Sequence, residues 1–183
     1  MVKSRRRRHW GDRPELLRES MLAQWPELPA DQKMKAHVFD VDGTLIDVSR
    51  VRWHVNLSDP RNRGFKDFHS FHEAAASEPP HAWVVDAINA VPEDEAAIVV
   101  TARKRMWETH TVWSLLLSGV ERIDHLFMRR DDDDRKDFLV KEDILEMINR
   151  RFEVERAFDD NPNVIALWES RGIPVTVVPG WEE

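Results

Sequence analysis

Apolar residues recur along this chain in short runs, and segments with helical periodicity separate the later runs. The runs fall at residues 36–41, 96–100, 125–128, 155–158 and 174–178. The helical patterns begin near His81, Lys104, Lys136 and Pro162. Continuous apolar runs that alternate with helices are typical of buried parallel strands whose two faces are both covered. The pattern therefore predicts an α/β fold with a doubly wound, Rossmann-like parallel sheet of about five strands.

Length and composition predict a basic N-terminal arm followed by one domain. The arm is residues 1–13, and the domain, residues 14–183, has its core at 36–179. An amphipathic pattern at residues 14–25 predicts a helix that packs on this core. Cysteine is absent, which excludes disulfides, zinc–thiolate sites and thiol nucleophiles. No apolar run is long enough to span a membrane, so we expect a cytoplasmic protein, of the host cell if viral, without membrane contact. The oligomeric state stays open.

Charge is distributed unevenly along the chain. The net charge is −7, but residues 1–13 carry +5 and the remainder carries −12. The run Arg5, Arg6, Arg7 and Arg8 suits nonspecific contact with the phosphate backbone of a nucleic acid. A solvated basic tail without a partner would have the same sequence.

The first apolar run ends in two aspartates and a glycine, in the heptad Val-Phe-Asp-Val-Asp-Gly-Thr at residues 38–44. A turn at Gly43 lets Asp40 and Asp42 converge beyond the carboxyl end of the strand. Crowded carboxylates repel unless a cation lies between them, which favours Mg²⁺ and leaves Asp40 available as a nucleophile. An ordinary turn that closes a strand is the alternative interpretation of this heptad.

The second apolar run is followed by Thr101 and Arg103. A hydroxyl at a strand end that opens a helix can donate to a phosphate oxygen, and the planar guanidinium of Arg103 suits phosphate as well. A threonine that merely caps the following helix is an equally good interpretation.

Two further clusters follow the later runs. Asp137 and Lys141 lie four residues apart on a predicted helix, where the aspartate can orient the lysine toward a phosphate. A solvated ion pair is the alternative for these two. The fourth strand ends in Asp159 and Asp160, which complete a carboxylate cage for Mg²⁺. The acidic run at 131–134 is expected to be a solvated loop.

Taken in chain order, the clusters that follow the first strand, the second strand, the start of the lysine helix and the fourth strand resemble the motifs of the haloacid dehalogenase superfamily. Most members of this superfamily are Mg²⁺-dependent phosphohydrolases. The closest resemblance is to the 3′-phosphatase domain of bacteriophage polynucleotide kinase. It covers roughly residues 36–179 and implies a haloacid dehalogenase fold with a minimal cap. The residues that carry it are Arg63-Gly64-Phe65-Lys66-Asp67, Arg135-Lys136-Asp137, Val140-Lys141-Glu142, Asp159-Asp160, Val164 and Leu167-Trp168.

The resemblance also implies a role for each matching residue. Asp40 would be the nucleophile and Asp42 the general acid and base. Thr101 and Lys141 would bind phosphate, and Asp137 would support Lys141. Arg63 and Arg103 would be further phosphate or substrate contacts. The metal ligands would be Asp40, the backbone carbonyl of Asp42, Asp159 and Asp160, and it stays open which of the last two touches the metal directly.

We expect a phosphatase of 3′-phosphorylated nucleic-acid ends, with DNA and RNA both possible. The chain contains no Gly-x-x-x-x-Gly-Lys-Ser/Thr loop, so we expect no kinase activity. A phosphatase of free nucleoside monophosphates is the alternative enzyme. A nucleic-acid-binding or structural protein on an inactive phosphatase fold is the alternative of another class. The long spacer at 47–80 is expected near the site entrance, with His69 and His72 as helix-surface residues.

Overall fold

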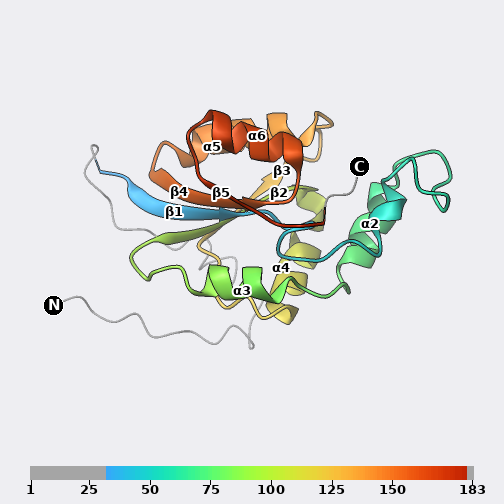
Figure 1. Ribbon diagram of the computed structural model, residues 1–183, viewed down its shortest axis with the longest axis horizontal. Helices are drawn as coiled ribbons and strands as arrows, with labels where there is room; N and C mark the ends of the chain where they lie inside the picture. Colours follow the sequence, from blue (N-terminus) through green and yellow to red (C-terminus); the bar gives the residue numbers. More distant parts are fainter. Residues whose placement is uncertain (1–31, 181–183) are drawn as a thin grey trace.

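The computed structural model describes residues 32–180, so the expected basic arm and the helix expected at 14–25 lie outside the described residues. The fold is built on a five-stranded parallel sheet in the order β3-β2-β1-β4-β5 (Figure 1). The predicted α/β fold is confirmed. Its strands are β1 (Met34–Phe39), β2 (Ala96–Lys104), β3 (His125–Arg129), β4 (Phe152–Asp159) and β5 (Val175–Val177).

Helices cover both faces of the sheet. Helices α5 (Asp137–Ile148) and α6 (Pro162–Ser170) lie over one face, and α3 (Ala82–Asn89) and α4 (Glu108–Leu117) lie under the other (Figure 1). The starts predicted near His81, Lys136 and Pro162 are therefore confirmed within one residue. Within residues 32–180, no helix is long and apolar enough to cross a membrane.

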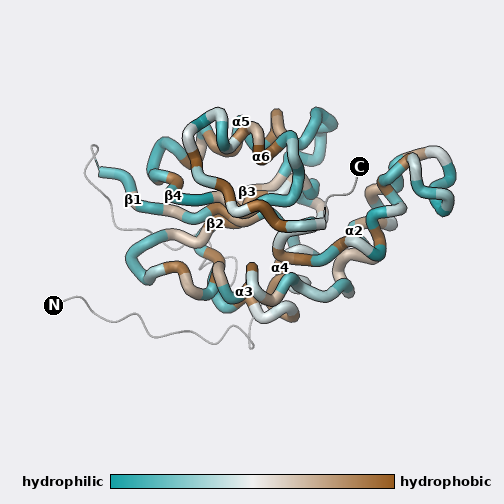
Figure 2. The backbone as a smooth tube through the Cα atoms, viewed as in Figure 1, coloured by the Kyte–Doolittle hydropathy of each residue, from teal (hydrophilic) through white to brown (hydrophobic). Residues whose placement is uncertain are grey.

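The apolar runs form two cores because successive side chains of a strand point to opposite faces. Phe39 of β1 and Val99 of β2 belong to the core on the side of α3 and α4. Their neighbours Val38 and Ile98 belong to the core beneath α5 and α6, where Trp168 is fully buried. Figure 2 shows the hydrophobic residues concentrated along the strands and on the inner sides of the helices. A continuous apolar run is thus what a strand between two helical layers requires.

The long spacer between β1 and α3 forms a small cap at one end of the sheet. It contains the short 3-10 helix η2 (Arg52–His54) and helix α2 (Phe68–Ala75). In Figure 1 this segment projects beyond the carboxyl ends of the strands. The cap therefore lies at the sheet edge where the predicted site residues emerge, as we expected of this spacer.

The second strand is longer than the sequence predicts, and this corrects the expectation for Thr101. Strand β2 continues to Lys104, which pairs with Arg129 of β3 after an irregularity in register. A 3-10 helix, η3 (Arg105–Trp107), comes next, and α4 starts only at Glu108. Thr101 therefore lies inside the strand, so it neither opens nor caps a helix. The pairing with β3 keeps the polar residues that follow Val100 extended.

Candidate active site

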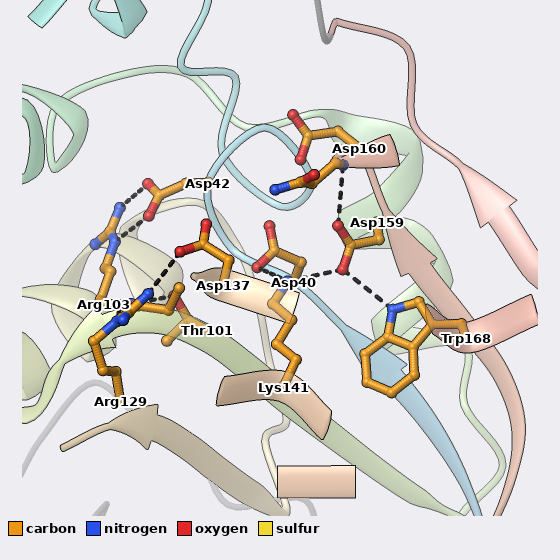
Figure 3. A network of polar contacts seen from close by, with 12 residues as sticks. Asp40, Asp42, Thr101, Arg103, Arg129, Asp137, Lys141, Asp159, Asp160 and Trp168 are labelled. Atoms are coloured by element: carbon orange, nitrogen blue, oxygen red, sulfur yellow. Dashed lines mark hydrogen bonds and ion pairs between the residues drawn. The ribbon is translucent and has the colours of Figure 1, made fainter. Parts of the chain in front are cut away.

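Three aspartates meet where the central strands β1 and β4 end (Figure 3). Asp40 follows β1, and its backbone amide donates to the carbonyl of Phe158 in β4 at 3.0 Å. Asp159 ends β4 and Asp160 follows it. All three are buried, and a carboxylate oxygen of each lies within 4.8 Å of one from the others. We call Asp40, Asp159 and Asp160 the acidic cluster.

Lys141 of α5 reaches into the acidic cluster. Its Nζ donates to Asp40 Oδ1 at 2.7 Å and to Asp159 Oδ2 at 2.8 Å. Burial raises the pKa of Asp40 well above its usual range, and the ammonium of Lys141 opposes this rise. Burial alone would lower the pKa of Lys141, but Asp159 and Asp40 outweigh it and raise that pKa. The lysine is thus a charged counterion of two buried carboxylates.

Asp160 has a different cation. Arg52 of η2 donates from Nη2 to Asp160 Oδ2 at 2.6 Å. Burial raises the pKa of Asp160 to about 6, although Arg52 pulls in the opposite direction. Arg52 was not predicted as a site residue, because no local motif connects a residue of the cap with an aspartate more than 100 positions away. The one indication in the sequence was that Arg52 lies in the spacer that follows Asp40 and Asp42.

Gly43 is required by the way Asp160 packs on the first motif. Its φ is +91°, in the region that disfavours residues with a side chain. A Cβ at this position would lie 2.0 Å from Asp160 Oδ2 and 2.6 Å from Arg52 Nη2. Glycine therefore permits both the tight turn and the approach of the acidic cluster.

Asp42 lies apart from the cluster and is held by Arg103 of β2. Arg103 donates from Nε to Asp42 Oδ2 at 2.8 Å and from Nη2 to Oδ1 at 2.6 Å. Its Nη1 donates to Thr111 at 3.2 Å, and the residue is 1% exposed. Burial would raise the pKa of Asp42, but Arg103 outweighs this effect and lowers the pKa. Arg103 was expected at the substrate phosphate, whereas its guanidinium here is bound to Asp42.

His72 of α2 lies on the other side of Asp42. Its Nδ1 is 3.9 Å from Asp42 Oδ2, and the ring packs against Trp107. Burial lowers the pKa of His72 to about 4, which keeps the ring neutral. His72 was expected on the helix surface with His69, and this is wrong for His72, because its side of α2 faces the sheet end. His69 is exposed, as expected.

Asp137 also has a partner other than the expected one. It accepts a hydrogen bond from Arg129 Nη2 at 2.6 Å, and Arg129 also donates to the carbonyl of Ala102 at 2.7 Å. Lys141, one turn farther along α5, is drawn to the acidic cluster. The expected support of Lys141 by Asp137 is therefore replaced by an Arg129–Asp137 ion pair that ties α5 to the ends of β2 and β3. Arg129 was not anticipated, since it closes an apolar run without a motif.

The remaining two candidates differ in position. Thr101 is 1% exposed, and its Oγ1 accepts from the backbone amide of Arg103 at 3.1 Å, so it lies beside the residue that holds Asp42. Arg63 is exposed in the loop before α2. In the part of the chain that the structure describes, no hydrogen bond or ion pair joins Arg63 to the acidic cluster.

The acidic cluster has the chemistry of a magnesium site. Mg²⁺ prefers oxygen ligands, and a divalent cation would offset the burial and the mutual repulsion that raise the pKa of Asp40 and Asp160. Trp168 Nε1 donates to Asp159 Oδ2 at 3.3 Å and helps to fix this carboxylate. The carboxylate of Asp42 is bound to Arg103, so its contribution to a metal would have to come from its backbone carbonyl.

Comparison with known proteins gives one family match and several structures with a similar fold. The family model of the polynucleotide kinase PNKP phosphatase domain matches residues 34–180. Two solved structures of the Pnkp1/Rnl/Hen1 RNA repair complex contain a chain 24% identical, with TM-scores of 0.61 and 0.62. The matches cover 85% of this chain but only 47% and 50% of those chains, so this chain spans about half their length.

Other solved structures share the fold. A class C acid phosphatase from Bacillus anthracis is 15% identical with a TM-score of 0.58, over 91% of this chain and 74% of that one. A haloacid dehalogenase-like hydrolase from Streptococcus pneumoniae is 14% identical with a TM-score of 0.54, over 79% and 84% of the two chains. No curated protein matches the chain.

Proposed function

The chain belongs to the family of polynucleotide kinase PNKP phosphatase domains, within the haloacid dehalogenase superfamily, and from this membership we propose that it is a Mg²⁺-dependent phosphatase of nucleic-acid 3′ ends. The observation that carries the proposal is the placement of Asp40. It is a buried carboxylate at the end of the central strand, in contact with Lys141 and beside two further aspartates. A nucleophile for phosphoryl transfer needs this combination of a fixed position and nearby positive charge.

The first step transfers the phosphoryl group to the protein. Asp40 attacks the phosphorus in line and forms an Oδ–P bond, while the bond from phosphorus to the leaving 3′-oxygen breaks. Lys141, which donates to Oδ1 of Asp40, holds this carboxylate in position for the attack. Protonated Asp42 gives its proton to the leaving oxygen, and the Arg103 pair stabilises the carboxylate that remains.

The second step hydrolyses the aspartyl phosphate. Asp42, now ionised, accepts a proton from a water molecule that attacks the phosphorus, and the bond to Asp40 breaks with release of inorganic phosphate. This restores the proton that Asp42 lost in the first step. Arg103 favours the ionised form of Asp42, which the second step needs. An anionic phosphate nearby favours the protonated form, which the first step needs.

Asp40, Asp159, Asp160 and the backbone carbonyl of Asp42 would hold the metal. When bound, Mg²⁺ neutralises phosphate oxygens and orients the substrate for in-line attack. Lys141 adds positive charge at the same carboxylates. We assign Thr101 to the phosphate side of the site and Arg63 to the substrate strand at the cap.

Two features support a nucleic-acid substrate. The family is that of a polynucleotide kinase phosphatase domain, and the solved chains that share the fold come from an RNA repair complex. A small cap does not by itself decide between a strand end and a free nucleoside monophosphate. The intact acidic cluster with its lysine argues against an inactive fold, because burial of three carboxylates is costly without a function.

Phosphate release tests the proposal. With Mg²⁺ present, we expect faster release from a 3′-phosphorylated oligonucleotide than from its 5′-phosphorylated isomer or from a free nucleoside monophosphate. Asp40→Asn should be inactive while it stays folded. Asp132→Asn, which removes an exposed carboxylate from the acidic loop, is the matched control and should keep full activity. Preference for the mononucleotide would contradict the substrate assignment, and activity in Asp40→Asn would contradict the mechanism.

A further inference from the structure

The cap carries a basic segment on an otherwise acidic chain. Residues 50–66, which we call the basic loop, contain five arginines or lysines and one acid, for a net charge of +4. Two of these cations have acidic partners: Arg52 pairs with Asp160 and Arg61 with Asp59. Arg63 and Lys66 form no ion pair in the described part of the chain and are exposed. The basic loop therefore presents uncompensated positive charge next to the proposed active site.

The basic loop and the start of α2 enclose a hollow of about 200 Å³. Its lining includes aromatic, cationic and polar side chains and one acid: Trp53, His54, Asn62, Arg63, Phe65 and Asp67. The Trp53 and His54 rings stack with centroids 3.7 Å apart, and the Arg61 guanidinium lies 5.6 Å from the Trp53 ring. Phe65 is 56% exposed, so its ring is accessible to a ligand at the hollow.

The hollow is held in place by Asn62. Its Nδ2 donates to the carbonyls of Trp53 and His54 at 2.9 and 3.1 Å. Its Oδ1 accepts from the amides of Gly64 and Phe65 at 2.8 and 3.1 Å. The side chain of a single residue thus joins both sides of the basic loop, and the aromatic rings are arranged before any ligand binds. Preorganisation of this kind lowers the entropic cost of binding.

The hollow is also connected to the acidic cluster. Trp53 and His54 belong to η2 together with Arg52, whose side chain contacts Asp160. A strand whose 3′ end lies at Asp40 would therefore pass the basic loop as it leaves the site. Aromatic side chains interleaved with cations bind single-stranded nucleic acids in this way, through base stacking and phosphate contacts.

We propose that this hollow binds a nucleobase of a single-stranded nucleic acid, with Phe65 as the stacking surface and Arg63 and Lys66 at the flanking phosphates. The proposal rests on the proposed function, because it places the strand end at Asp40. It extends that function by assigning the part of the substrate upstream of the terminal phosphate. It would also let the protein distinguish a strand end from a mononucleotide, which has no upstream base.

The test is binding rather than turnover, so that its failure and the failure of the proposed function are distinguishable. Full-length chains that carry Asp40→Asn are titrated with a fluorescent single-stranded oligonucleotide that lacks a terminal phosphate. Phe65→Ala should weaken binding about tenfold, and Phe65→Trp should restore it. Leu117→Ala is the matched control, because it removes an 80% exposed apolar side chain at the end of α4, and it should bind normally.

A second variant tests the electrostatic part. Arg63→Ala should reduce the slope of log affinity against log salt concentration by about one, which corresponds to the loss of one phosphate contact. Arg150 is an exposed arginine after α5, and Arg150→Ala should leave the slope unchanged. The Arg5–Arg8 arm is the same in every variant, so only differences between variants are compared. Unchanged affinity in Phe65→Ala, equal loss with a duplex of the same sequence, or no binding by the parent chain would overturn the proposal.

Discussion

Replacing Lys141 with methionine should destabilise the protein strongly, and by an amount that depends on pH. Methionine keeps the length of the side chain but removes the ammonium that contacts Asp40 and Asp159. Lys141 is 2% exposed and both carboxylates are buried, so water cannot replace the lost contacts. The variant would leave three neighbouring carboxylates with Arg52 as the only cation in contact among the described residues.

The expected magnitude follows from this geometry. Breaking a buried ion pair by removing one partner costs about 3–5 kcal/mol of unfolding free energy, because the other charge stays buried and uncompensated. Near pH 7.5 we expect a loss in this range. Near pH 5 the loss should be smaller. Without the lysine, the buried carboxylates of the folded variant have higher pKa values than in the unfolded chain, so they bind protons at this pH and lose their mutual repulsion.

Urea unfolding without added metal measures the effect at the two pH values. Lys35→Met is the matched control, because its ammonium contacts Glu155 at 3.2 Å on the surface, and it should leave stability nearly unchanged. A loss below about 1 kcal/mol for Lys141→Met, or an equal loss at both pH values, would refute the counterion role of Lys141.

Further predictions concern the turn, the pH dependence and the Asp42 pair. Gly43→Ala should abolish phosphatase activity and lower stability by at least about 1–3 kcal/mol in urea unfolding, since its Cβ would displace Asp160; wild-type activity would contradict the geometry. Because burial raises the pKa of Asp160 to about 6, above that of an unfolded aspartate, the metal-free protein should lose stability as pH rises from about 4 through 6. Mg²⁺ should restore stability above pH 6 in thermal melts, and equal melting temperatures with and without the ion would count against the cluster as its site. Arg103→Lys keeps a charge but loses the paired hydrogen bonds to Asp42, so kcat should fall about tenfold or more. The pKa of Asp42 should rise, which moves the alkaline limb of the pH profile to higher pH. An unchanged profile would show that Arg103 does not set this pKa.

The strands were predictable from short apolar stretches, of which Ala96 to Val100 in β2, fully buried between the two helical layers, is the longest. The run at 96–100 was cut short because Thr101 and Arg103 are polar, yet they stay extended within β2. Arg103 can be buried there because its charge is neutralised by Asp42. A hydrophobicity pattern does not contain this compensation, since the two residues are 61 positions apart.

The same limit applies to the site. The sequence placed Asp40, Asp159 and Lys141 at adjacent strand and helix ends, and the structure brings them into contact. The partners of the other charged groups were less predictable, because they are chosen by distant elements. Arg52 comes to Asp160 from the cap, and Asp137 pairs with a residue of β3 rather than with its neighbour on the helix. Helical spacing indicates which residues share a face, whereas the strongest nearby opposite charge decides which of them form a pair.

The central claim is that Asp40 carries the phosphoryl group, and trapping the acyl phosphate tests it most directly. Turnover of a 3′-phosphorylated oligonucleotide with Mg²⁺ is quenched in acid, the protein is reduced with borohydride, and its peptides are analysed by mass spectrometry. Reduction converts an aspartyl phosphate to homoserine, which we expect at position 40 and not at position 42. An active enzyme with homoserine at another position, or with none in repeated rapid quenches, would contradict the account.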